Sequence, residues 1–355
     1  MTAPTWATAP PAASTSPAPA PSLTGAGPAV TTLSMVAALR QALADSLRHD
    51  PKVLVMGEDV GRLGGVFRVT DGLWSEFGER RVMDSPLAEA GIVGTAIGLA
   101  LRGFRPVVEI QFDGFVFPAF DQIVSQLAKL HSRSGGRSQM PVTVRIPYGG
   151  GIGAIEHHSE SPEALFAHVA GLRVVSPATP GDAYAMLRQA IACPDPVIFL
   201  EPKARYWDTD EVTIGPDLQV EQFDRARIVR PGSLVTLATY GPGLAPSLKA
   251  ADALAAQGRD VEVIDLRSMS PLDVDTVASS VDRTGRLVVV HEAPVFGGIG
   301  GELAAAVMER CFYRLEAPVA RVGGYHMPYP PARVEHEYLP TAGRVIHAVE
   351  GVLSY

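Results

Sequence analysis

Residues 86–110 read PLAEAGIVGTAIGLALRGFRPVVEI, a helical pattern followed directly by a buried strand. Val107 to Ile110 form a continuous apolar run of the kind expected for a strand covered on both faces. Similar runs lie at Val53 to Met56, Val142 to Ile146, Arg173 to Val175 and Val197 to Leu200, and helical patterns occur at 36–47, 86–101, 115–130 and 180–191. This alternation predicts an α/β fold with a mainly parallel sheet and helices on both faces.

The second half of the chain resumes the alternation after a break. Between 206 and 227 the pattern lapses into charged and turn residues, and apolar runs then return at Leu234 to Ala238, Val261 to Leu266 and Leu287 to Val290. Helical patterns at about 243–257, 273–282 and 299–312 lie between and after these runs. We expect a tail over 1–30, a first α/β domain over 31–205, a linker over 206–227 and a second α/β domain over 228–355.

The first 30 residues are almost entirely Ala, Pro, Thr, Ser and Gly, and the first charged residue is Arg40. Such a stretch buries too little apolar surface to offset the entropy of ordering it, so we expect a disordered tail. Its prolines interrupt any apolar run, and it lacks the basic start of a signal peptide.

Composition excludes several classes of protein. The 355 residues carry a formal net charge of −8 without a Lys/Arg run at either end, which disfavours nucleic-acid binding. No stretch approaches the roughly 20 apolar residues of a membrane-spanning helix. Cys193 and Cys311 are the two cysteines of the sequence and form no Cys-x-x-Cys pair, so they are too few for a disulfide framework or a thiolate metal site. We expect a cytoplasmic protein that binds neither nucleic acid nor a membrane.

Two glycine-rich segments invite a functional interpretation. The run 297–301 follows a strand and opens a helix, but the third glycine of a Gly-x-Gly-x-x-Gly fingerprint would fall on Leu303. A plain strand-to-helix turn is therefore favoured over a phosphate cradle. The run 149–153 precedes Glu156, His157 and His158, and its glycines permit close approach of the backbone to a ligand or to another chain.

Glu89 and the histidine pair each leave two interpretations open. Ser85 and Pro86 have the pattern of a helix start, so Glu89 is either a capping carboxylate or a functional one that is desolvated by close packing of the small residues after it. Adjacent side chains in an extended segment point to opposite sides, so His157 and His158 predict one catalytic or structural histidine rather than a metal pair.

Short motifs follow one another from about residue 31 to the C-terminus: GEDV (57–60), GVF (65–67), DSPLAE (84–89), EIQF (109–112), FPAFDQ (117–122), HHSESPE (157–163), FLEPK (199–203), VIDLR (263–267) and HEAP (291–294). In this order and spacing they resemble the beta subunit of the thiamine-diphosphate-dependent 2-oxo acid dehydrogenases. The resemblance implies a transketolase-like pyrimidine-binding domain and then a transketolase C-terminal α/β domain. It also implies an α2β2 assembly with active sites between alpha and beta chains.

The resemblance assigns roles to individual residues. Glu89 matches the glutamate that hydrogen-bonds the aminopyrimidine ring of thiamine diphosphate and exchanges a proton with it, and Glu58 matches a second cofactor-side glutamate. His158 matches the histidine that faces the reacting carbon, with roles in binding the substrate carboxylate and in reductive acylation of lipoyl groups. Phe115 stands where relatives often have a tyrosine beside the pyrimidine, and Gln111 is a further candidate for the pocket.

Metal binding is also implied by the resemblance. Thiamine-diphosphate enzymes usually hold Mg²⁺ and the diphosphate with a Gly-Asp-Gly followed by Asn, and this chain contains no Gly-Asp-Gly. The alpha subunit is therefore expected to hold both. Relatives bind a structural monovalent cation, for which K⁺ is the candidate, through backbone carbonyls matching Met140, Val142, Thr143, Ala190, Cys193 and Asp195.

We expect a branched-chain 2-oxo acid dehydrogenase that acts on 3-methyl-2-oxobutanoate and acylates the dihydrolipoyl acyltransferase core. The preference for branched chains rests on the similarity of stretches such as 109–122 and 132–137. Pyruvate and acetoin dehydrogenase beta subunits stay open as alternatives. Retention of Glu58, Glu89 and His158 disfavours a non-catalytic docking scaffold, and the failed glycine fingerprint disfavours an independent NAD-dependent oxidoreductase.

Overall fold

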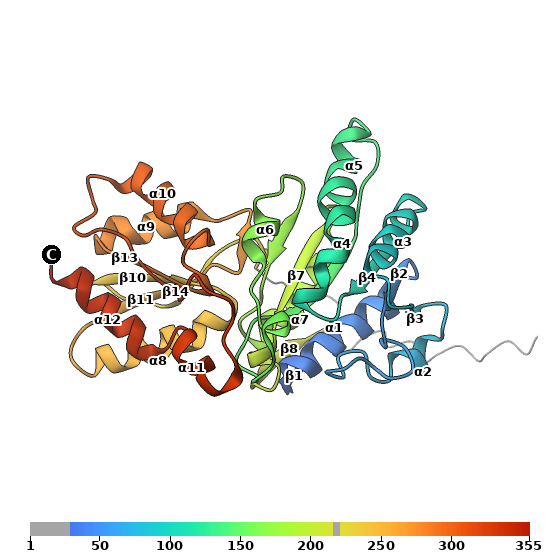
Figure 1. The fold of residues 1–355 in the computed structure, drawn as a ribbon, viewed down its shortest axis with the longest axis horizontal. Helices are drawn as coiled ribbons and strands as arrows, with labels where there is room; N and C mark the ends of the chain where they lie inside the picture. Colours follow the sequence, from blue (N-terminus) through green and yellow to red (C-terminus); the bar gives the residue numbers. More distant parts are fainter. Residues whose placement is uncertain (1–28, 216–220) are drawn as a thin grey trace, which may run out of the picture.

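The computed structural model describes residues 29–215 and 221–355, which form two layered α/β units (Figure 1). The tail expected over 1–30 lies outside the described residues except for its last two positions, which begin a strand.

The first sheet is built mainly from the N-terminal half of the chain. Within the described residues its strand order is β12 (Ser268–Ser270), β6 (Arg173–Val175), β7 (Val197–Pro202), β5 (Thr143–Tyr148), β4 (Arg105–Glu109), β2 (Val53–Gly57) and β3 (Val82–Asp84). All neighbouring pairs are parallel except β12 with β6. The mainly parallel sheet expected from the continuous apolar runs is confirmed.

Helices cover both faces of this sheet (Figure 1). Val197 and Phe199 of β7 share a core with α1 (Met35–His49) and α7 (Pro180–Ala192). Ile198 and Leu200 point the other way, into the core with α3 (Glu89–Leu101) and a helical segment made of η1 (Asp113–Val116), α4 (Phe117–Asp121), η2 (Gln122–Leu127) and α5 (Ala128–Arg133). Side chains that alternate along a strand thus fill two cores. The connections contain α2 (Leu73–Phe77), η3 (Glu156–His158), α6 (Glu163–Ala167) and η4 (Lys203–Arg205).

The second sheet comes from the C-terminal half. Its order among the described residues is β14 (Ala320–Gly324), β13 (Leu287–Pro294), β10 (Val235–Thr239), β11 (Val261–Asp265) and β9 (Arg227–Arg230), and β9 alone is antiparallel to its neighbour. Figure 1 shows α8 (Leu244–Ala255) and α12 (Ala342–Leu353) on one face and α9 (Val274–Thr284) and α10 (Ile299–Cys311) on the other. The connections contain η5 (Gly241–Gly243), η6 (Ala332–Val334) and α11 (Glu335–Tyr338).

One strand lies where the sequence pattern indicated only charged and turn residues. β8 (Thr209–Ile214) pairs antiparallel with β1 (Ala29–Ser34), in a ribbon apart from both sheets. Of β8 only Val212 is buried, so the strand carries no apolar run that would reveal it. Over the described parts of the chain, no helix combines the length and apolar character needed to cross a membrane.

Candidate active site

The candidate site lies at the carboxyl ends of the parallel strands. From β2 the chain crosses to β3 at the sheet edge and then returns to β4 on the other side of β2. Ligands of open α/β sheets bind outside the carboxyl ends of strands where the strand order reverses in this way. Glu58 directly follows β2, Gln111 follows β4, and His158 lies in the loop after β5. Three predicted site residues thus lie together at the carboxyl end of the sheet.

Glu58 is buried, with 6% of its surface exposed. Its Oε1 atom has no hydrogen-bond partner among the described residues. Burial raises the pKa of Glu58, and the charges of Glu89, Asp59 and Glu109 raise it further. Asp84 at the end of β3 fixes the loop after Glu58, because its carboxylate accepts from the backbone N–H of Gly61 at 2.6 Å. A buried carboxyl with a raised pKa and an unpartnered oxygen can exchange a proton with a ligand.

Glu89 is the first residue of α3 and is half-buried. The helix start expected at Ser85 and Pro86 is wrong: the position before the helix is Ala88, which provides no side-chain cap. The backbone N–H of Ser85 donates instead to the carbonyl of Gly57, which holds the segment against β2. Glu89 therefore lies at the positive end of the α3 dipole, next to Glu58, and not on a surface turn.

Gln111 acts on the backbone beside it. Its Nε2 donates to the carbonyl oxygen of Glu58 at 2.7 Å and lies 3.4 Å from Oε1 of Glu109. The side chain thereby joins the ends of β2 and β4 and fixes the start of the loop that carries Glu58.

The histidine pair forms one aromatic cluster. His157 and His158 lie in the short 3-10 helix η3 with ring centroids 4.3 Å apart, so the expectation that they point to opposite sides is wrong. A 3-10 turn rotates successive side chains by about 120°, less than an extended segment does. Phe112 and Phe115 both meet the His158 ring edge-on, each with centroids 5.3 Å away. Phe112 was not predicted.

The His158 ring favours its neutral form. Burial lowers the pKa of His158, and the neighbouring His157 and Lys203 lower it further. Its Nδ1 atom is buried without a hydrogen-bond partner in the described part of the structure. A neutral imidazole with one unengaged nitrogen can accept or deliver a proton.

Two buried charge clusters lie beneath the carboxyl end of the sheet, and neither was predicted from the sequence. Arg145 of β5 donates to Glu109 at 2.6 Å and to Glu201 at 2.6 and 2.9 Å, and Tyr206 donates to Glu201 at 2.7 Å. Burial alone would lower the pKa of Arg145, but the two carboxylates raise it above its usual value. The signal was available in the sequence, because an arginine inside an apolar run requires buried partners.

The second cluster lies beside the histidines. Lys203 pairs with Asp113, and both side chains are fully buried. Burial raises the pKa of Asp113 to about 6, against the opposing effect of Lys203. The Lys203 ammonium lies 5.5 Å from the centroid of the Phe112 ring, so it contributes positive charge close to His158.

The glycine run 297–301 proves to be a packing feature. A Cβ on Gly298 or Gly300 would come within 2.7 Å of the ring of His291, which lies beneath this turn. His291 is fully buried, and its Nδ1 bonds the carbonyl of Ala293 at 2.9 Å. The two glycines therefore make room for an imidazole.

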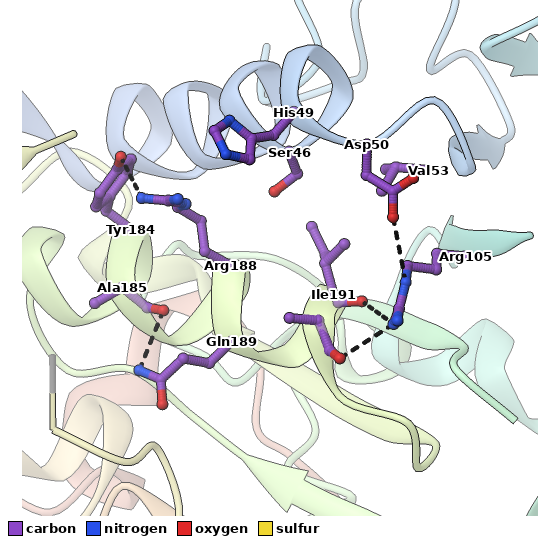
Figure 2. Close-up of a pocket in the computed structure, with 11 residues that line it drawn as sticks. Ser46, His49, Asp50, Val53, Arg105, Tyr184, Ala185, Arg188, Gln189 and Ile191 are labelled. Atoms are coloured by element: carbon purple, nitrogen blue, oxygen red, sulfur yellow. Dashed lines mark hydrogen bonds and ion pairs between the residues drawn. The ribbon is translucent and has the colours of Figure 1, made fainter. Parts of the chain in front are cut away.

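A pocket of about 360 Å³ lies between α1 and α7, away from these residues (Figure 2). It reaches Arg105 at the amino end of β4, whereas the glutamates lie at the carboxyl ends. Its charged residue Arg105 is engaged: it pairs with Asp50 at 3.3 Å and also donates to the carbonyls of Ile191 and Ala192. This pocket is separate from the candidate active site.

The segments predicted to bind a monovalent cation lie together. The N–H of Met140 donates to the carbonyl of Pro194 at 3.1 Å, which brings the approach to β5 against the end of α7. The carbonyls of Met140, Val142 and Ala190 each already accept one backbone hydrogen bond. In the described residues no group of three or more His, Cys, Asp or Glu side chains is arranged to hold a metal ion.

Comparison with known proteins gives a consistent result. Two family models match, "Transketolase, pyrimidine binding domain" over residues 31–207 and "Transketolase, C-terminal domain" over 224–345. The chain is 56% identical over 337 residues to the pyruvate dehydrogenase E1 component subunit beta of Leifsonia xyli, covering 95% of this chain and 99% of that protein. It is also 56% identical over 324 residues to the 3-methyl-2-oxobutanoate dehydrogenase subunit beta of Mycobacterium tuberculosis, covering 90% and 92%.

The chain belongs to the 2-oxo acid dehydrogenase beta subunits. The 2-oxoisovalerate dehydrogenase subunit beta of Pseudomonas aeruginosa is 46% identical over 339 residues, with 91% of this chain and 96% of that protein covered. A solved split gene transketolase, described as an inactive beta4 tetramer, matches with a TM-score of 0.74 at 25% identity, covering 91% and 98%. The expected resemblance and the transketolase-like two-domain α/β fold of the 2-oxo acid dehydrogenase beta subunits are confirmed.

Enzymes of this family use thiamine diphosphate. The site residues fit the aminopyrimidine half of that cofactor, because the buried carboxyl of Glu58, whose Oε1 has no partner among the described residues, lies beside the carboxyl of Glu89. The partly exposed ring of Phe115 packs against His158 and offers an aromatic face. The chain lacks the Gly-Asp-Gly that usually holds the diphosphate with Mg²⁺.

Proposed function

We propose that this chain catalyses, with an alpha subunit in an α2β2 assembly, the oxidative decarboxylation of the branched-chain 3-methyl-2-oxobutanoate and reductive acylation of the lipoyl group of a dihydrolipoyl acyltransferase. The observation that carries the proposal is the gathering of Glu58, Glu89 and His158 at one edge of the sheet, with polar atoms of Glu58 and His158 left unpartnered among the described residues. The missing Gly-Asp-Gly supports an alpha partner that supplies Mg²⁺ and the diphosphate site.

The chain's own residues have distinct tasks in this proposal. Thiamine diphosphate, when bound, supplies the electron sink that decarboxylation of a 2-oxo acid requires. Glu89 holds and exchanges a proton at its carboxylate against the aminopyrimidine, and Glu58 lies beside it as a second carboxyl. Phe115 offers an aromatic face for the ring. His158, neutral near pH 7, moves a proton at its imidazole during acyl transfer.

Branched-chain preference is supported by the names of the Mycobacterium and Pseudomonas relatives, and pyruvate by that of the Leifsonia relative. To test the choice, this chain is co-expressed with the alpha chain of the adjacent reading frame, and kcat/KM is measured for both substrates. We expect roughly tenfold or greater preference for 3-methyl-2-oxobutanoate. Preference for pyruvate favours the second candidate. A loaded assembly without turnover of either 2-oxo acid contradicts the enzyme assignment, and turnover by this chain alone contradicts the need for a partner.

The proposed K⁺ site has its own test. Helix C-terminal carbonyls carry partial negative charge, and Ala190 is in the last turn of α7, whose C-cap is Cys193. Replacing potassium by choline at constant ionic strength should lower the melting temperature of the chain, since a cation that binds only the folded state stabilises it. Equal melting temperatures in the two salts count against the site.

A further inference from the structure

The loop that carries His158, here called the histidine loop (residues 149–160), is closed at its base. The N–H of Gly149 donates to the carbonyl of Glu160 at 2.9 Å. Between these ends only η3 has regular structure. The place of the His158 ring therefore depends on what holds the backbone of the loop.

Two glutamates from the C-terminal half bind the first part of the histidine loop. Glu335 accepts from the N–H groups of Gly151 at 2.7 Å and Gly153 at 3.1 Å. Glu292, near the end of β13, accepts from the N–H of Gly150. Both carboxylates are buried, with 8% and 5% of their surface exposed. Gly151 and Gly153 have φ of +82° and +70°, a backbone conformation that residues with a side chain rarely adopt.

The other end of the histidine loop is held by the pyrimidine-binding domain. Asp113 accepts from the N–H of Glu160 at 2.7 Å and pairs with Lys203. A Cβ on Gly114 would collide with the carbonyl oxygen of His157, so the loop lies directly against η1. Each half of the chain thus holds one end of the loop.

Stability alone does not explain why buried glutamates hold this loop. A buried carboxylate loses its hydration, and even a well hydrogen-bonded one adds little net stability compared with apolar packing. A carboxylate that accepts from two backbone amides instead fixes the positions of those amides, because charge-assisted hydrogen bonds have a defined geometry. Tyr329 donates to Oε1 of Glu335 at 2.7 Å and so fixes the carboxylate in turn.

We propose that Glu335, assisted by Glu292, is a positioning residue of the catalytic histidine: it fixes the backbone of the histidine loop from the C-terminal half and thereby places the His158 ring against Phe112 and Phe115. The inference rests on the proposed function, in which His158 is catalytic, and it assigns the C-terminal half a role in positioning that residue. Glu335 acts through His158 and touches no reacting atom.

The kinetic test is a double-mutant cycle on the reconstituted α2β2 enzyme, with acyl transfer to lipoyl groups as the measured step. Glu335→Ala should lower kcat about 10- to 100-fold with little change in KM, since small displacements of a catalytic group have effects of this size. In a His158→Ala background the same change should have almost no effect, because the group it positions is absent. Glu335→Gln keeps one acceptor and should fall between. Glu337→Ala removes an exposed carboxylate from the same short helix and serves as the matched control.

A second readout does not depend on turnover. In hydrogen exchange, Glu335→Ala should raise the exchange rate of the amides at 150–153 while leaving the strands of the first sheet protected. If Glu335→Ala does not assemble, Glu335→Gln and Tyr329→Phe are measured instead, with the same direction expected.

Unchanged exchange in the loop, or equal effects of the Glu335 variants with and without His158, overturns the inference and leaves the proposed function intact. A wild-type assembly that turns over no 2-oxo acid overturns the proposed function, while the exchange experiment still reports on the loop.

Discussion

Glu89 and Glu58 form a pair of carboxyls in which Glu58 is buried and Glu89 is half-buried. Their separation into a buried carboxyl with a raised pKa and a half-buried carboxyl at a helix start follows from the backbone, because Glu58 directly follows a strand and Glu89 begins a helix. Single substitutions at this scale distinguish chemistry from structure.

Glu89→Gln keeps size and some hydrogen bonding but cannot exchange a proton. We expect exchange of the thiazolium proton of the bound cofactor, followed by NMR in deuterated water, to slow about 10²- to 10⁴-fold. Melting temperature should change little. Glu79→Gln, at an exposed position, is the control. Wild-type exchange in Glu89→Gln would return the residue to a structural role.

His291 makes stability depend on pH. Burial lowers the pKa of His291 to about 4, against an unfolded value near 6.5. Between these values the unfolded chain binds a proton that the folded chain does not, so stability falls as the pH falls through this window. Between pH 7 and 5 this group should remove about 2 kcal/mol of unfolding free energy. In urea titrations His291→Gln should lose this part of the pH dependence, and the exposed His336→Gln should keep it.

At the scale of elements, strands covered on both faces could be predicted and edge strands could not. β2, β5 and β7 are continuous apolar runs because helices cover both sides. β1 and β8 are largely exposed and therefore lack such a pattern. The strand pattern alone did not indicate the site residues that follow the parallel strands; Glu58, Gln111 and His158 were predicted from the resemblance. Partners such as Lys203 for Asp113 could not be predicted, because 90 residues separate them and only the fold brings them together.

Arg145 connects β4, β5 and β7 through Glu109 and Glu201. Arg145→Met should cost about 3–5 kcal/mol of unfolding free energy, because it leaves two buried carboxylates unpaired. Burial already raises the pKa of Glu109, and without Arg145 it should rise further, so the folded variant takes up protons and its deficit should shrink as the pH falls. Exposed Arg133→Met should change stability by under about 0.5 kcal/mol. Equal losses in the two variants, measured by urea unfolding, would contradict the role of the network.

At the scale of the whole molecule, the two domains share buried polar contacts. Tyr240 of the second domain donates to Glu163 at 2.7 Å, and both side chains are buried. Tyr240→Phe should destabilise the chain by about 1–3 kcal/mol, because it removes the side-chain donor of the buried Glu163 carboxyl. Tyr313→Phe, on a side chain that is 96% exposed, is the control. A variant that melts like the wild type would show that this contact does not join the domains.

The strand β12 belongs to the second half of the sequence but completes the first sheet, pairing with β6 through Ser268 and Ser270. Translation delivers residues in order, so β6 remains an open edge until nearly a hundred further residues have left the ribosome. During that interval the edge can pair with another nascent chain. The first domain therefore cannot complete its sheet before part of the second domain has been synthesised. A gene fragment that ends in the linker would encode a first sheet that lacks β12.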